Sequence, residues 1–140
     1  MSDFALDASA ALAWCFAAEA DTKSEALLER MLDGAVAEVP AVWFLEIANV
    51  LAVAERRRAL SAADVAEAVT LYASLPVHVD DADISGRGFG DILALAHAQR
   101  LSSYDAAYLD VAMRAGLPLA TRDNALKAAA RRVGVRLIAC

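Results

Sequence analysis

The segment from Ser102 to Asp123 reads Ser-Ser-Tyr-Asp-Ala-Ala-Tyr-Leu-Asp-Val-Ala-Met-Arg-Ala-Gly-Leu-Pro-Leu-Ala-Thr-Arg-Asp, and it decides which fold we expect. Its pattern predicts a helix over 104–115, stopped by a glycine, and then a short strand over 117–120. Asp105 lies in the first turn of this helix, and Asp123 follows the strand. Both acids also suit helix capping, so their role depends on what the rest of the chain supplies.

Short apolar stretches alternate with helical patterns along the whole sequence. The predicted strands span residues 3–7, 35–39, 76–79, 117–120 and 135–138. The predicted helices span residues 10–18, 22–32, 41–58, 61–74, 91–100, 104–115 and 124–132, and a glycine-rich loop is expected over 80–90. This alternation is typical of an α/β protein whose parallel sheet carries helices on both faces. We expect one domain over residues 1–140.

The composition indicates a helix-rich protein outside the membrane. Hydrophobic residues make up 59% of the chain, and much of the excess over the usual share is alanine, a helix former. Uncharged runs such as Ala8 to Ala18 are shorter than the roughly 20 residues that a membrane span needs. No basic segment precedes an apolar one at the start, so we expect no signal peptide and a cytoplasmic location.

The charge balance argues against broad electrostatic binding to nucleic acid. The net charge is −6 and the pI is about 4.8, whereas general nucleic-acid binders are usually basic. A cluster of carboxylates that holds metal cations would itself contribute several of these negative charges. The acidic balance is therefore compatible with a metal-dependent nuclease.

Three acids are expected near one edge of the sheet. Ligands of parallel α/β sheets bind beyond the carboxyl ends of the strands, near the point where the strand order reverses. Asp7 follows the first predicted strand, with Ser9 expected to cap the next helix, and Asp123 follows the fourth strand. Asp105 begins the helix before that strand. Each acid alone is also explained by capping of the following helix.

Glu46 is the most informative acid. It is the only charged residue between Val39 and Ala54, within a predicted helix that is apolar nearly all round and is therefore expected to be buried. A lone buried carboxylate is costly unless a partner compensates it. That partner is either a metal ion, with Asn49 on the same helix face to orient the carboxylate, or an arginine such as Arg56 or Arg114.

Four carboxylates form a hard, oxygen-only set of ligands, which suits Mg²⁺ or Mn²⁺. Zinc is disfavoured because the only histidines, His78 and His97, lack ligand spacing. A divalent ion bound to carboxylates lowers the pKa of a bound water and polarises a phosphoryl oxygen, which is the chemistry of phosphodiester hydrolysis. Asp110 lies about 140° round the helix from Asp105, so we place it outside this site.

Four short motifs, in this order, resemble those of PIN-domain ribonucleases, specifically the toxins of VapBC-type toxin–antitoxin pairs. The motifs are Leu6-Asp7-Ala8-Ser9, Glu46-Ile-Ala-Asn49-Val-Leu, Ser103-Tyr-Asp105-Ala-Ala-Tyr108 and Leu117-Pro-Leu-Ala-Thr121-Arg-Asp123. The resemblance covers nearly the whole chain. It implies a three-layer α/β/α fold around a parallel sheet of about five strands.

The resemblance also implies a function and a set of site residues. The family cleaves single-stranded regions of RNA, often tRNA or ribosomal RNA, with Mg²⁺ or Mn²⁺ held by acids. Here the implied metal ligands are Asp7, Glu46, Asp105 and Asp123, and the residues implied to support or orient them are Ser9, Thr121 and Asn49. The resemblance further implies homodimers and inhibition by a cognate antitoxin.

Two other functions share features with this sequence, and one apolar segment is a candidate binding site for a partner. A phosphohydrolase of the haloacid-dehalogenase type would need a second acid two residues after Asp7, where Ser9 stands. A non-catalytic interaction module with the same fold would have no need of the four acids. Trp14, Phe16 and the helix at 22–32 could form an apolar groove for an antitoxin helix, although such aromatics are more often ordinary core.

Overall fold

A computed structural model describes residues 2–82 and 84–140, so Met1 and Asp83 lie outside the described residues. Five short parallel strands form one sheet in the order β3-β2-β1-β4-β5. The strands are β1 (Phe4–Leu6), β2 (Ala37–Val39), β3 (Val77–Val79), β4 (Leu119–Ala120) and β5 (Leu137–Ile138). The predicted parallel sheet of about five strands is therefore confirmed.

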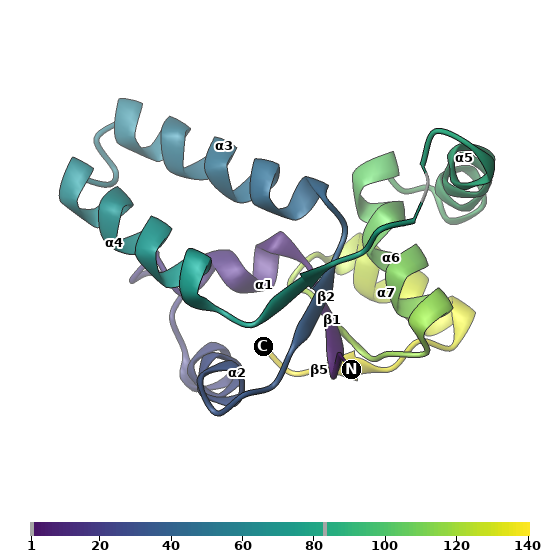
Figure 1. The fold of residues 1–140 in the computed structure, drawn as a ribbon, viewed down its shortest axis with the longest axis horizontal. Coiled ribbons are helices and arrows are strands. Elements are labelled where there is room, and N and C mark those ends of the chain that lie inside the picture. The colour runs from purple at the N-terminus through teal and green to yellow at the C-terminus, as the bar shows by residue number, and fades with distance from the viewer. Residues whose placement is uncertain (1, 83) are drawn as a thin grey trace.

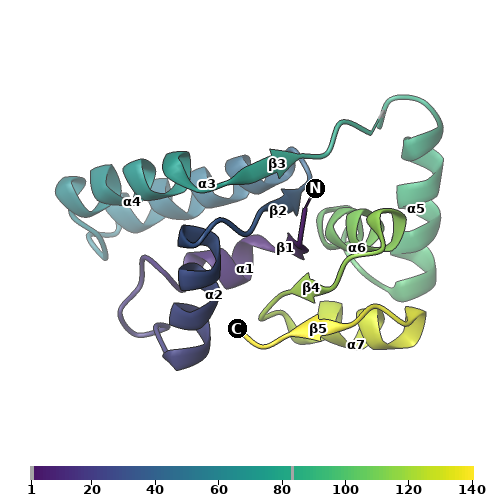
Figure 2. The same cartoon turned by 60° about the horizontal axis from the view of Figure 1, so that its bottom comes forward.

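Seven helices in the described part of the chain cover the two faces of the sheet (Figures 1 and 2). One face carries α1 (Ala8–Leu12), α2 (Thr22–Leu32), α3 (Val42–Arg56) and α4 (Ala62–Ser74). The other face carries α5 (Arg87–Gln99), α6 (Ser103–Ala115) and α7 (Asn124–Val133). The result is the three-layer α/β/α arrangement expected from the alternating pattern.

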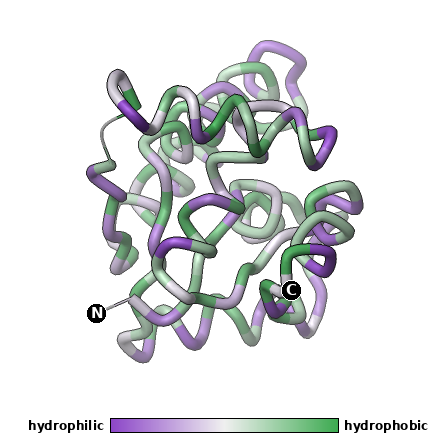
Figure 3. The backbone as a smooth tube through the Cα atoms, turned by 90° about the vertical axis from the view of Figure 1, so that its right-hand side faces the viewer, coloured by the Kyte–Doolittle hydropathy of each residue, from purple (hydrophilic) through white to green (hydrophobic). Residues whose placement is uncertain are grey.

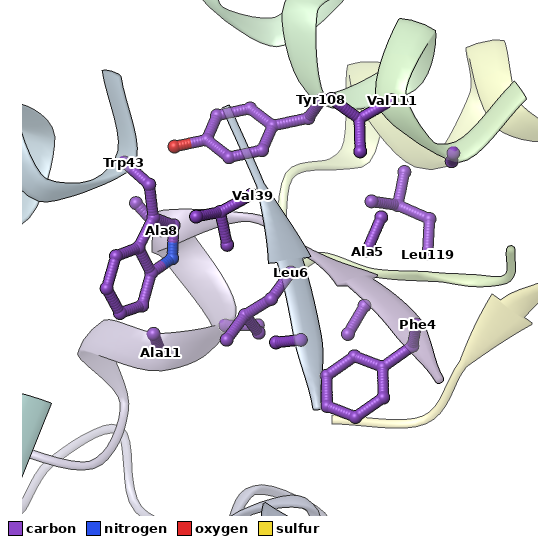
Figure 4. Packing of buried hydrophobic residues seen from close by; sticks show 14 of the residues in the cluster. Phe4, Ala5, Leu6, Ala8, Ala11, Val39, Trp43, Tyr108, Val111 and Leu119 are labelled. Carbon is purple, nitrogen blue, oxygen red and sulfur yellow. The ribbon is translucent and has the colours of Figure 1, made fainter. Parts of the chain in front are cut away.

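The core lies where α6 crosses the middle of the sheet. All three residues of β1 are fully buried, because helices cover both of its faces. Six residues of α6 are buried, and three of them are alanines, which let the helix approach β1, β2 and β4 closely. In Figure 4 the side chains of Tyr108 and Val111 project from α6 over the strands. This packing fixes the start of α6 above the carboxyl edge of the sheet.

The topology places a switch point between β1 and β4. These strands are neighbours, with Ala5 opposite Leu119 and Leu6 opposite Ala120. After β1 the chain turns into α1 on one face, whereas after β4 it turns into α7 on the opposite face (Figure 1). The two connections diverge at this point, which is the switch point where α/β sheets bind their ligands.

Two predicted boundaries near the first and fifth helices are wrong. The first helix ends at Leu12 instead of residue 18, and the indole N–H of Trp14 donates to the carbonyl of Ser24 (2.8 Å), which ties the following segment to α2. The glycine-rich segment expected as a loop instead forms the first turn of α5, which begins at Arg87. Packing of α5 against α6 overrides the low helix propensity of its glycines.

The prediction that the helix carrying Glu46 is buried all round is also wrong. Only one stripe of α3 is buried, formed by Trp43, Ile47, Leu51 and Ala54. On the opposite side Leu45 is 71% exposed and Phe44 is 42% exposed. In Figure 3 hydrophobic and hydrophilic colours alternate along the backbone of the helices.

Within residues 2–82 and 84–140, none of the helices combines the length and apolar character that a bilayer crossing requires.

Candidate active site

Asp7 is the centre of the candidate site, directly beyond β1. It occupies the N-cap position of α1 but makes no side-chain capping bond, so capping does not explain it. Its Oδ2 instead accepts hydrogen bonds from the hydroxyls of Ser9 and Thr121, both at 2.6 Å. Only 3% of Asp7 is exposed. The carboxylate is therefore held by hydroxyls from both sides of the switch point.

The orientation of both hydroxyls is fixed by backbone donors. The backbone N–H of Arg122 donates to Ser9 Oγ (2.9 Å), and that of Asp123 donates to Thr121 Oγ1 (3.1 Å). Each hydroxyl oxygen thus accepts a hydrogen bond from the backbone of the loop after β4, and each hydroxyl donates a hydrogen bond to Asp7. Ser9 was expected to cap α1, but its hydroxyl donates to Asp7 instead.

Asp123 combines a capping role with a place near Asp7. Its Oδ1 accepts from the backbone N–H of Leu126 (2.8 Å), so the capping explanation holds for this residue. Its negative charge nevertheless contributes to raising the pKa of Asp7. One oxygen of Asp123 is committed to α7, whereas its charge still acts on Asp7 and Asp105.

Glu46 is partnered by a tyrosine and not by an arginine. The hydroxyl of Tyr108 donates to Glu46 Oε1 at 2.9 Å. Arg114, one of the expected partners, instead contacts Asp80 (2.6 Å) and Asp110 (2.7 Å). The arginine alternative is therefore wrong for Arg114, and Tyr108 is a site residue that the sequence analysis missed.

Burial and mutual repulsion raise the pKa of three carboxyl groups. For Asp7, burial raises the pKa and the hydroxyls of Ser9 and Thr121 oppose it. Burial is also the main cause of the raised pKa of Glu46, and the charges of Asp7 and Asp105 raise it further. The pKa of Asp105 is raised by burial and then by the charges of Asp7 and Asp123. The four acids therefore form one electrostatically coupled cluster.

Arg122 is a second residue that the sequence analysis did not identify. Its guanidinium donates to the carbonyl of Glu19 (2.7 Å) and to the carboxylate of Asp21 (2.7 Å). It thereby fastens the segment between α1 and α2 beside the loop that carries Thr121 and Asp123. Nothing in its local sequence pattern, apart from its place between these two residues, indicates this role.

Across the described residues, Asn49 and Asp110 take no part in the hydrogen bonds of the acidic cluster. Asn49 is exposed on α3, one turn beyond Glu46, and in the described part of the chain it is not hydrogen-bonded to that residue. Asp110 forms its ion pair with Arg114, so it lies outside the acidic cluster as expected. The roles of Asn49 and of the four acids in binding or catalysis stay predictions.

The donor chemistry of the cluster fits a hard divalent cation. All its donors are carboxylate or hydroxyl oxygens, and partly desolvated carboxylates that repel one another are stabilised by a cation. Among the described residues, however, no three acid, histidine or cysteine side chains are arranged as a finished metal cage. Mg²⁺ commonly uses one or two carboxylates and keeps several waters, so a finished protein cage is not required for it.

Comparison with known proteins identifies the family. Residues 4–132 match the PIN domain model, and the chain belongs to this family. Its structure is similar to the crystal structure of PAE2754 from Pyrobaculum aerophilum, with a TM-score of 0.66 and 25% sequence identity. The match covers 91% of this chain and 79% of that one. The comparison with curated proteins gives no match. Membership of the PIN family indicates nuclease activity in general, and PIN nucleases typically use divalent metals.

Proposed function

We propose that this protein is a toxin endoribonuclease that hydrolyses phosphodiester bonds in single-stranded RNA with Mg²⁺ or Mn²⁺. One observation carries the proposal. A buried aspartate at the switch point of the sheet is held by two hydroxyls, and its charge and those of Glu46, Asp105 and Asp123 act on one another. Such an arrangement is costly without a cation and is suited to phosphate chemistry with one.

Asp7, Glu46, Asp105 and Asp123 are the residues that would hold the metal. When bound there, a divalent ion would supply an activated water and a polarised phosphoryl oxygen. The chain's own groups orient the ligands: Ser9 and Thr121 hold one oxygen of Asp7, and the N-terminus of α7 holds one oxygen of Asp123. In this proposal Asn49 faces the substrate, because it is exposed one turn beyond Glu46.

An exposed aromatic residue supports a single-stranded substrate. Tyr104 directly precedes Asp105 and is 60% exposed. Unpaired bases commonly stack on exposed aromatic side chains, whereas bases within a duplex are already stacked. Because the net charge of the chain is −6, substrate binding would depend on such contacts and on metal more than on a general basic surface.

Exposed apolar surface supports the proposed protein partners. A cavity of about 630 Å³ lies between residues 14–18 and α4, and it is lined by Trp14, Phe16 and Leu71. We propose that the antitoxin binds there. The helix at 22–32, which was expected to complete this groove, is not among the lining residues.

Phe44 and Leu45 on α3, with Phe89 and Leu93 on α5, offer apolar surface for a homodimer.

The proposal is tested by cleavage of RNA with the purified protein in Mn²⁺ and in EDTA. Asp7→Asn and Asp105→Asn are expected to abolish cleavage while far-UV circular dichroism is unchanged. Hydrolysis of a small phosphomonoester without RNA cleavage would instead indicate a phosphohydrolase. Absence of Mn²⁺ binding by calorimetry would indicate a non-catalytic interaction module.

A further inference from the structure

Tyr108 occupies an unusual place for a core tyrosine. The residue is fully buried, and its ring extends from α6 across the carboxyl end of β2 towards the start of α3 (Figure 4). Its hydroxyl donates to Glu46 Oε1 at 2.9 Å. The ring belongs to the hydrophobic core, whereas the hydroxyl belongs to the acidic cluster. Tyr108 therefore links the packing of α6 to the conformation of a carboxylate on α3.

The second buried tyrosine shows what a purely structural hydroxyl does in this protein. Tyr72 is 4% exposed, and its hydroxyl donates to the backbone carbonyl of Ala11 at 2.7 Å. That bond satisfies a buried donor and touches none of the four acids. Tyr108 directs its only donor to a carboxylate instead, although Glu46 is itself partly exposed and open to water.

Helix geometry explains why α6 can serve two acids at once. Asp105 and Tyr108 are three residues apart, so their side chains share one face of the helix. Asp105 contributes its carboxylate directly, and Tyr108 reaches Glu46 on the neighbouring α3. With Oε1 held by the phenol, the rotation of the Glu46 carboxylate is restricted and Oε2 is left as the oxygen for a ligand.

We propose that Tyr108 is a positioning residue that orients Glu46 for binding a divalent metal. This inference rests on the proposed function, because it requires Glu46 to be a metal ligand. Hydrogen-bond partners of metal ligands typically contribute 10–100-fold to metal affinity. We expect a loss of about this size when the Tyr108 hydroxyl is removed.

The test compares Mn²⁺ dissociation constants of metal-free wild type, Tyr108→Phe and Tyr72→Phe, measured from the electron paramagnetic resonance signal of free Mn²⁺. Both variants keep the ring and lose one buried hydroxyl, so Tyr72→Phe is the matched control. Tyr108→Phe is expected to weaken Mn²⁺ binding roughly 10–100-fold, and Tyr72→Phe to leave it unchanged. Circular dichroism confirms that each variant is folded.

A double-mutant cycle separates positioning from a general structural role. If Tyr108 acts through Glu46, Tyr108→Phe has no further effect on Mn²⁺ affinity in the Glu46→Ala background. An equal loss in both backgrounds, or unchanged affinity in Tyr108→Phe, would overturn the inference and leave the proposed function standing. Failure of the wild type to bind Mn²⁺ at millimolar concentrations would overturn the proposed function itself.

Discussion

Thr121 and Asp7 are 114 residues apart in the chain, and the Thr121 hydroxyl donates a 2.6 Å hydrogen bond to the Asp7 carboxylate. The bond crosses the switch point between β4 and β1, and both residues are almost fully buried. It therefore links the two halves of the sheet at the switch point. A contact of this kind contributes both to stability and to the shape of the candidate site.

The first prediction concerns this bond. Thr121→Val keeps the shape of the side chain but removes the donor to Asp7 and the acceptor for the N–H of Asp123. Loss of a buried hydrogen bond to a charged group costs about 1.5–3 kcal/mol, and we expect urea denaturation to show a decrease in unfolding free energy of that size. Thr70→Val is the matched control, because the Thr70 hydroxyl is exposed on α4. Equal losses in both variants would contradict the account.

The second prediction concerns pH. Burial and the charges of Asp7 and Asp123 raise the pKa of Asp105. A carboxyl group with a raised pKa binds its proton more tightly when the protein is folded. Its contribution to stability is therefore present at low pH and is lost as the pH rises through the pKa of the folded state. The metal-free protein should lose this contribution from about pH 4 upward.

Neutralisation of Asp105 should therefore stabilise the metal-free protein at pH 7. Asp105→Asn removes the repulsion, and we expect a gain of roughly 0.5–1 kcal/mol, the size typical of partly exposed charge interactions. Asp110→Asn is the control on the same helix, because it removes an ion pair with Arg114 and should be neutral or slightly destabilising. Thermal unfolding in EDTA at pH 5 and pH 7 measures both. Destabilisation by Asp105→Asn at pH 7 would argue against a repulsive cluster.

The third prediction concerns metal and stability. A ligand that binds only the folded state stabilises it, by about 2.7 kcal/mol at 100 times its dissociation constant. Mn²⁺ and Mg²⁺ should therefore raise the melting temperature of the wild type. The same ions should have little effect on Asp7→Asn, which loses the central carboxylate. NaCl at the same ionic strength controls for general screening. An equal shift in the wild type and in Asp7→Asn would place metal binding elsewhere.

Much of the fold follows from local sequence signals. Capping boxes at Asp21 and Ser61 mark the starts of α2 and α4, and glycines close α6 and α7, so these boundaries agree closely with the predictions. The start of α5 could not be predicted in this way, because contact with α6 decides it and its glycines locally favour a loop. The exposed side of α3 could not be predicted from the sequence, because its side chains are apolar although they face water.

The candidate site was predictable only in part. The positions of Asp7 and Asp123 follow from the rule that ligands bind beyond the carboxyl ends of parallel strands. The partner of Glu46 does not follow from its own helix, because Tyr108 comes from α6 and is 62 residues away. Its spacing of three from Asp105 was the available signal, since it places both side chains on one helix face.

Metal-dependent cleavage of RNA by the wild type and by Asp7→Asn tests the central claim most directly. The substrate is an unstructured RNA, with the same sequence annealed into a duplex as control, incubated with Mn²⁺ or with EDTA. We predict cleavage of the single strand by the wild type in Mn²⁺ alone, and at least a 100-fold loss in Asp7→Asn, on the order of the loss of one essential catalytic group. Cleavage in EDTA, or equal cleavage by Asp7→Asn, would contradict the account.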